Sequence, residues 1–154
     1  MMDFLRNVFI FGGLEDVELV LVERIASIRS YKKGDVIFRE DDKANEFFIV
    51  EKGLVAINKN VAGGRKRNLA NFGPGETFGE LAMFDAEPRS ASVEAVDTTS
   101  VLAISIEEFQ TLLAQNPVIA AKVQARIIQK LSERIRNTNN LINEGVIWGF
   151  KMAS

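Results

Sequence analysis

The sequence predicts an α+β protein: a β jelly-roll barrel flanked by short N-terminal helices and a long C-terminal helix. Three observations support this fold class. Short β-rich runs alternate with turn residues from about residue 28 to about residue 106. Apolar residues at helical spacing precede them, and a longer stretch with three-four spacing follows. With 154 residues and no internal repeat, we expect one domain over residues 1–142, with residues 143–154 as a tail.

Two short helical pieces are expected at the N-terminus, at about residues 4–11 and 14–27, with Gly12 and Gly13 between them. The second piece carries apolar residues that recur every three or four positions, as on one face of a helix. That predicted stripe consists of Leu14, Val17, Val20, Leu21, Arg24 and Ile25.

The central region contains turn residues at regular intervals. They lie at residues 34–35, 41–42, 53, 63–64, 73–75 and 97. Glycine and aspartate favour tight turns because they tolerate backbone angles that other residues avoid. Several short strands at this spacing are typical of a β-sandwich or barrel, and here we expect a jelly roll.

Two helices are expected at about residues 107–142. Ser105 can cap the first, and Glu108, three residues later, completes a capping box. Asn116 and Pro117 break the helix and start the next one, because proline suits the first helical turn. The last helix should run to about Asn140.

The last helix carries two stripes. The apolar seam consists of Ala121, Gln124, Ile128, Leu131, Ile135, Thr138 and Ile142. It either packs on the barrel or pairs with a second copy of the chain as a homodimer. The basic row consists of Lys122, Arg126, Lys130 and Arg134. A charged row is usually a solvated face, but this one could instead meet an acidic partner or a nucleotide.

The most informative segment runs from Gly75 to Val93. Gly79 precedes a predicted short helix, residues 80–84, and glycine there allows a close approach to the backbone. The first amides of a helix lack internal partners and favour an anion. Pro88 ends the helix, and a strand is expected from Arg89 to Val96.

Arg89 falls on the apolar face of that strand, together with Ala91, Val93 and Ala95. A guanidinium directed at a core requires a partner, because an unpaired buried charge is costly. A single phosphate fits this arrangement, and a carboxylate such as Glu80 beside it suits a ribose hydroxyl. The alternative is that Arg89 pairs with Glu80, Asp85 or Glu87.

The order of these residues resembles the phosphate-binding cassette of the cyclic nucleotide-binding domain family. Phe78-Gly-Glu-Leu-Ala82 matches its helix start, and Pro88-Arg-Ser-Ala-Ser-Val93 matches its arginine segment. The resemblance extends from about Leu14 to about Leu141. One departure is Glu40-Asp41-Asp42, where the family often has Glu-Gly-Asp. Aspartate tolerates unusual turn angles, so we expect the turn to survive, at a place remote in sequence from the pocket.

The resemblance implies a module that binds a 3′,5′-cyclic nucleotide monophosphate, cAMP or alternatively cGMP, and that moves its C-terminal helix on binding. It implies that Arg89 pairs with the cyclic phosphate and that Glu80 accepts the 2′-hydroxyl. Gly79 to Ala82 would supply backbone amides, Leu81 would face the sugar and base, and Ser90 would lie near the phosphate and base. Ser132 and Trp148 are weaker candidates for contacts with the base. No other cofactor and no metal is expected.

Composition narrows the function further. The chain has no Cys and no His, which argues against thiolate or imidazole metal sites and against Cys-His or Ser-His-Asp catalysis. We therefore expect no enzyme. A net charge of −2 argues against general nucleic-acid binding, and no apolar run is long enough to span a membrane. A cytoplasmic location, with an unidentified protein effector, is expected.

Two other readings stay open. In the first, the chain is the ligand-binding fragment of a transcription regulator. About a dozen residues after the last helix are too few for a DNA-binding module within this chain. In the second, the fold is a ligand-free interaction scaffold.

Overall fold

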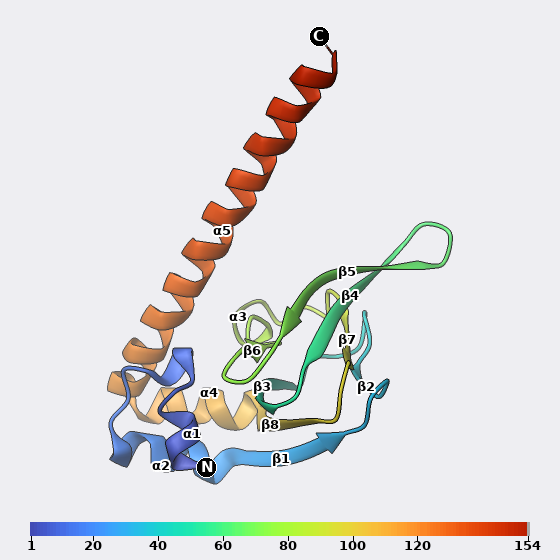
Figure 1. Cartoon of the computed structure of the whole chain (residues 1–154). Coiled ribbons are helices and arrows are strands. Elements are labelled where there is room, and N and C mark those ends of the chain that lie inside the picture. The colour runs from blue at the N-terminus through green and yellow to red at the C-terminus, as the bar shows by residue number, and fades with distance from the viewer. Residues whose placement is uncertain (154) are drawn as a thin grey trace.

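The computed structural model describes the backbone of residues 1–153 and the side chains of residues 1–145. Helices from both ends of the chain gather at one side of two antiparallel sheets, and the last helix projects away from the strands (Figure 1). The α+β prediction is thus confirmed. The elements are α1 (Met2–Leu5), η1 (Phe9–Phe11), α2 (Asp16–Ile25), β1 (Ala26–Tyr31), β2 (Val36–Phe38), β3 (Glu46–Lys52), β4 (Val55–Val61), β5 (Arg65–Phe72), β6 (Thr77–Phe78), α3 (Ala82–Asp85), β7 (Ser92–Ala95), β8 (Thr99–Ser105), α4 (Ile106–Gln115) and α5 (Pro117–Ala153).

The second N-terminal helix lies close to its predicted position, whereas the first predicted piece is divided into α1 and η1. The predicted stripe of α2 is confirmed for Leu14, Leu21 and Ile25, which pack against the core, and wrong for Val17. Val17 is 72% exposed, whereas Leu19 and Val22 are fully buried. Apolar residues occupy nearly every position from 19 to 22, so helical spacing alone fits more than one face. The packing against the core selects the face that carries Leu19 and Val22.

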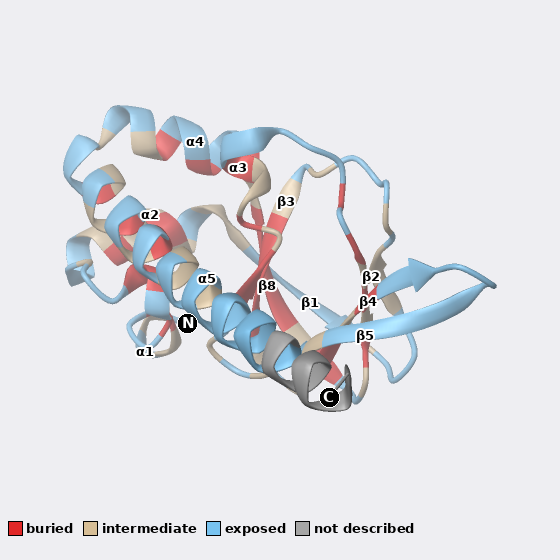
Figure 2. Cartoon of the chain, turned by 90° about the horizontal axis from the view of Figure 1, so that it is seen from above, coloured by how far each residue is buried: buried red, intermediate tan, exposed pale blue. Residues whose placement is uncertain are grey.

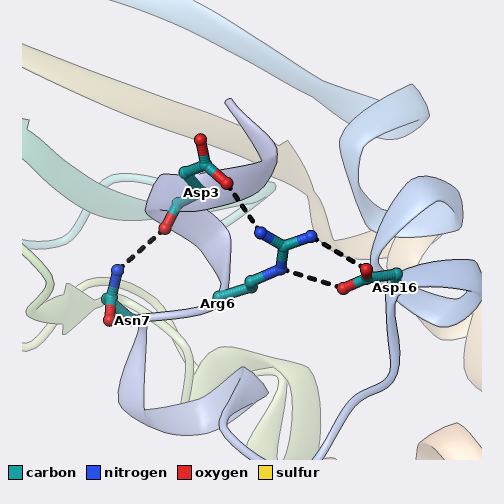
Figure 3. A network of polar contacts seen from close by, with 4 residues as sticks. All are labelled: Asp3, Arg6, Asn7 and Asp16. Carbon is teal, nitrogen blue, oxygen red and sulfur yellow. Dashed lines mark hydrogen bonds and ion pairs between the residues drawn. The ribbon is translucent and has the colours of Figure 1, made fainter.

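Arg6 fixes the start of α2 against α1. Its guanidinium donates to both carboxylate oxygens of Asp16, at 2.9 and 2.8 Å, and to Asp3 at 2.6 Å (Figure 3). The hydrogen bond from Arg6 lowers the pKa of Asp16 below its ordinary value. These groups are exposed, so the network orients the two helices rather than stabilising the fold strongly.

The two sheets have the strand orders β1-β8-β3-β6 and β2-β7-β4-β5, and the pairs within them are antiparallel. Strands β3 and β8 are buried on both faces and run through the middle of the molecule (Figure 2). Phe47 and Ile49 belong to the core shared with the helices. Phe48 and Val50 belong to the second core, which also includes Phe78 and Val93. Alternation along one strand therefore divides the apolar residues between two cores.

The C-terminal helices begin as predicted but end later. The Ser105 hydroxyl accepts a hydrogen bond from the Glu108 amide at 3.3 Å, and α5 begins at Pro117. The predicted end near Asn140 is wrong, because the backbone stays helical to Ala153. No proline interrupts this stretch, and its single glycines, such as Gly145, cost a helix only about 1 kcal/mol each.

Helix α5 packs on the domain with a face adjacent to the predicted seam. Ile119, Val123 and Ile127 are buried in the core shared with the other helices. Ile128 and Ile135 of the apolar seam are 63% and 61% exposed, so the prediction that the seam packs on the barrel is wrong for these two residues. The alternative, a homodimer formed through this helix, stays a prediction.

Candidate functional site

The segment from β6 to β7 forms one wall of a cavity. Gly79 follows β6 with a φ of +78°, a backbone angle that favours glycine. Helix α3 starts at Ala82, two residues later than predicted, and ends at Asp85, followed by Ala86 with a left-handed φ of 54°. Strand β7 starts at Ser92 rather than Arg89, so Arg89 lies in the loop that leads into the strand.

The predicted alternation of faces nevertheless begins at Arg89. Arg89 is 7% exposed, and Ala91, Val93 and Ala95 are likewise buried, whereas Ser90 is exposed. The prediction that the guanidinium points inward is confirmed.

Arg89 contacts carbonyl oxygens and aromatic rings. Its Nη1 donates to the Gly79 carbonyl at 3.4 Å, and its Nη2 donates to the Glu46 carbonyl. The guanidinium carbon lies 4.0 Å from the centre of the Phe38 ring, a cation–π contact. The buried Nε has no hydrogen-bond partner among the side chains of residues 1–145.

No carboxylate forms an ion pair with Arg89 among the residues that the structure describes. The alternative in which Arg89 pairs with Glu80, Asp85 or Glu87 is therefore not observed. Burial lowers the pKa of Arg89 below its ordinary value, and the charges of Glu46 and Asp42 oppose that shift only in part. The site holds a desolvated cation that an anion would stabilise.

The turn at residues 40–42 supports Arg89 directly. Asp41 has a φ of 70°, so the aspartate adopts the left-handed turn angle that we expected it to tolerate. The Asp41 amide donates to the Arg89 carbonyl, and the Arg89 amide donates to the Asp42 carbonyl, both at 2.9 Å. The turn is remote from the pocket in sequence, as expected, but antiparallel pairing of β2 with β7 brings the two segments together in space.

Glu80 is 2% exposed, and its carboxylate accepts a hydrogen bond from a lysine of α5. Lys130 Nζ donates to Glu80 Oε1 at 2.6 Å and to the Thr77 carbonyl at 2.8 Å. The Lys130 ammonium therefore has two acceptors, whereas the Glu80 carboxylate has this one donor among the described residues.

A cavity of ≈ 400 Å³ lies against these groups. The six predicted ligand-binding residues all line it: Gly79, Glu80, Leu81, Ala82, Arg89 and Ser90. The other walls include Phe38 of β2, Ile57 of β4, Leu69 and Phe72 of β5, and Arg134 of α5. The cavity is thus mainly apolar, with a few polar groups at one end, as small-molecule sites usually are.

The two weaker candidates have different outcomes. Ser132 is exposed and is not among the residues that line this cavity. The α5 residue at the cavity is Arg134, whose guanidinium carbon lies 5.8 Å from the Phe72 ring centre. The side chain of Trp148 lies outside the described residues.

The basic row faces the domain. Lys122 binds Glu18 of α2 at 2.8 and 3.0 Å, and Arg126 lies 5.4 Å from the ring of Phe9. Lys130 and Arg134 contact the cavity region. All four side chains are partly buried, so the prediction of a solvated face is wrong. The regular spacing predicted the row, but spacing does not tell which surface a row faces.

Two further searches of the described residues gave no site. The side chains include no group of three or more acidic residues placed to hold a metal ion. No helix in this part of the chain has the length and apolar character needed to cross a bilayer.

Residues 28–116 match the family model described as a cyclic nucleotide-binding domain. The chain is similar to the cyclic AMP receptor protein of Thermus thermophilus, with 35% identity over 80% of this chain and 57% of that protein. A crystallised cyclic nucleotide-binding domain from Methylobacillus flagellatus superposes with a TM-score of 0.79 and 25% identity, covering 92% of this chain and 79% of that one. The regulatory domain of Toxoplasma gondii PKA, solved with cAMP, gives a TM-score of 0.73 and 28% identity over 85% of this chain and 48% of that one.

Proposed function

Because the chain belongs to the cyclic nucleotide-binding domain family, we propose that it binds a 3′,5′-cyclic nucleotide monophosphate in this cavity, with cAMP as the first choice. The observation that carries the proposal is Arg89, a buried arginine at the cavity wall without an acidic partner among the described residues. The proposal concerns this domain. The chain spans 57% of the receptor protein it matches, so the activity of any larger assembly is a separate question.

Arg89 supplies the charge for the phosphate. In the described part of the chain, its Nε has no partner and its two Nη atoms bind only carbonyl oxygens. A guanidinium with an available donor in a mainly apolar cavity can fork onto two phosphate oxygens, which yields short, charge-assisted hydrogen bonds. The adjoining loop of Gly79 to Ala82 allows the anion to approach the backbone, since Gly79 has no side chain in the way.

Glu80 supplies an acceptor for the sugar. One of its carboxylate oxygens binds Lys130, and the residue lines the same cavity as Arg89. A carboxylate repels a phosphate but accepts a hydrogen bond from a hydroxyl, so the two residues suit two different parts of one nucleotide. The aromatic and aliphatic wall, including Phe38 and Leu69, suits the base.

The choice of cAMP follows from the relatives. One of them is named as a cyclic AMP receptor, and another was solved with cAMP. Ser90 at the cavity wall suits either nucleotide, because a hydroxyl can bind a phosphate or a guanine amino group. cGMP is therefore the alternative ligand.

We assign the domain a sensing role rather than catalysis. The relatives described above are receptor and regulatory proteins. Helix α5 reaches the cavity through Arg134 and holds Glu80 through Lys130, so a ligand that contacts these residues favours one position of the helix. The output is a shift in the position of α5.

Calorimetric titration with cAMP, cGMP, 5′-AMP and a cyclic dinucleotide tests the ligand. We expect one site per chain that prefers a cyclic mononucleotide, with 5′-AMP as the control for general phosphate binding. Absence of heat and of thermal stabilisation with every nucleotide would support the ligand-free scaffold instead.

Hydrogen exchange with and without nucleotide tests the sensing role. Protection should rise in residues 79–90 and also along α5. Protection confined to residues 79–90 would indicate a rigid binder.

A further inference from the structure

The hairpin of β4 and β5 projects from the body of the domain, and its outer part is basic (Figure 1). Lys59, Arg65, Lys66 and Arg67 are all exposed, and residues 59–67, the basic hairpin, contain no acidic residue (Figure 2). The whole chain has a net charge of −2, so this positive charge is a local feature. A basic group confined to one exposed element indicates a surface for a negatively charged partner.

Two of the four cations have acidic partners within the protein. The Nζ atoms of Lys59 and Lys66 lie 3.2 and 3.6 Å from glutamate oxygens. Arg65 and Arg67 form no ion pair with the residues that the structure describes. Arg67 also lies directly opposite Lys59 in the pairing of the two strands, and like charges in this arrangement destabilise a hairpin. An anionic group beside Arg67 would offset that repulsion.

Strand β5 is also the edge of its sheet. The strand order is β2-β7-β4-β5, so β5 pairs with β4 on one side only. Alternate residues of a strand direct their N–H and C=O groups to opposite edges, so about half of the eight residues of β5 turn these groups away from β4. No backbone hydrogen bond joins residues 65–72 to a described segment other than β4. The outer edge of β5 therefore offers donors and acceptors at strand spacing.

An extended acidic peptide suits both features. Its backbone can pair with the outer edge of β5, and its carboxylates can reach Arg65 and Arg67. Antiparallel pairing with β5 of a second copy would instead bring two sets of basic residues together, and like charges on an edge oppose such pairing. Single-stranded nucleic acid would find no aromatic side chain for base stacking in residues 59–67.

We propose that the outer edge of β5 is a docking site for an extended acidic segment of a partner protein, which adds to the sheet as a further strand. The backbone of the partner supplies hydrogen bonds, and its acidic side chains provide specificity for the basic hairpin. The docking site is separate from the nucleotide cavity, because residues 59–67 do not line that cavity.

Fluorescence anisotropy with a labelled peptide of alternating valine and glutamate, matched in length to the eight residues of β5, tests the docking. The parent chain should bind it, and raising the salt from about 50 to about 300 mM should weaken binding, because the contact is partly electrostatic. The double variant Arg65→Glu with Arg67→Glu should bind at least about tenfold more weakly, since two attractive contacts become repulsive.

The double variant Lys32→Glu with Lys33→Glu is the matched control. It changes the net charge by the same amount in another exposed segment, between β1 and β2. Its affinity for the peptide should stay within about twofold of the parent, because it leaves β5 intact. Equal losses in the two double variants would overturn the inference, and so would a parent chain that does not bind the peptide.

Two methylated peptides distinguish strand addition from charge attraction alone. One carries N-methyl groups on its valine amides and the other on its glutamate amides, so each lacks the donors of one edge. One of them should bind at least about tenfold more weakly than the unmethylated peptide, and the other should bind within about twofold of it. Equal effects of the two methylations would overturn strand addition.

Hydrogen exchange locates the peptide on the protein. Saturating peptide should protect residues 65–72 and leave unchanged β1, which is an edge strand of the other sheet. Equal protection of the two edge strands would contradict a specific site on β5. An oligothymidylate of the same charge should not displace the peptide, because it cannot form the strand hydrogen bonds. Displacement at comparable concentrations would show that the basic hairpin attracts any polyanion, which would also overturn the inference.

Discussion

Arg89 and Lys130 are two cations that donate into the same short segment, Thr77 to Glu80, and their charges are balanced in different ways. Lys130 comes from α5 and binds the Glu80 carboxylate and the Thr77 carbonyl. Arg89 precedes β7, and its hydrogen bonds to residues that the structure describes go to the carbonyls of Gly79 and Glu46. One charge is neutralised within the protein, and the other has no acidic partner among the described residues.

The difference separates two uses of a buried charge. A buried charge with a partner is compensated within the fold. Removing one partner destabilises the folded state, because the other charge stays buried without compensation. A charge held by carbonyls and aromatic rings contributes little to the fold, but it is available to an anion that enters the site. Arg89 in the cavity wall is therefore available to an anion, whereas Lys130 connects the cavity wall to α5.

The largest expected effect is on stability, and it should distinguish the two cations. Lys130→Met should lower the free energy of unfolding by about 3 kcal/mol, because Glu80 would remain buried without its cation. Arg89→Met should change it by less than about 1 kcal/mol, since only hydrogen bonds to carbonyls are lost and a desolvated charge is removed. Urea unfolding of the two variants in the absence of nucleotide measures both values.

The double variant Glu80→Gln with Lys130→Met serves as the control. It should recover part of the stability lost in Lys130→Met, because the unpaired carboxylate is gone. Equal losses in Arg89→Met and Lys130→Met would contradict the distinction between the two cations.

The sequence was sufficient to predict Arg89 but not Lys130. The inward direction of Arg89 follows from local alternation with Ala91 and Val93, and alternation persists even though β7 starts three residues later than predicted. The partner of Lys130 lies fifty residues earlier in the chain. Helical spacing assigns Lys130 to a row, but only the packing of α5 on the core decides what that row faces.

The second prediction concerns binding. Arg89→Ala should weaken cyclic nucleotide binding by at least about 2 kcal/mol, roughly thirtyfold, because a charge-assisted contact is lost. Arg89→Lys should also bind more weakly, since a point charge cannot fork onto two oxygens. Titration calorimetry measures both, and parental affinity in Arg89→Ala would show that the phosphate lies elsewhere.

The limits of sequence interpretation are clearest along the helices. The start of α5 was predictable because Asn116 and Pro117 act locally, whereas its end was not, because nothing local stops the helix near Asn140. The buried face of α2 was predicted only in part, and the α5 residues buried in the core, Ile119, Val123 and Ile127, lie outside the predicted seam. In both helices apolar residues occupy adjacent positions, and the choice between neighbouring stripes depends on long-range packing onto β3 and β8.

The third prediction concerns Gly79, which lies in the segment that both Arg89 and Lys130 contact. A Cβ on Gly79 would lie 2.6 Å from Arg89 Nη1, and its φ of +78° disfavours any other residue. Gly79→Ala should cost about 1.5 kcal/mol of stability from the backbone angle. It should also weaken nucleotide binding, because the guanidinium must shift away from the loop. Retained affinity with reduced stability would mean that the guanidinium has room to move without losing the phosphate.

The smallest expected effect comes from the turn that supports the backbone of Arg89. Asp41 adopts a φ of 70°, and its amide donates to the Arg89 carbonyl at 2.9 Å. Asp41→Gly should raise the free energy of unfolding by about 0.5 kcal/mol, because glycine removes the steric cost of the left-handed angle but loses more entropy on folding. Nucleotide affinity should stay unchanged, since the hydrogen bond comes from the backbone. Thermal unfolding with and without ligand tests both statements. A loss of affinity in Asp41→Gly would show that the aspartate side chain, and not only the turn, helps to position the unpaired cation.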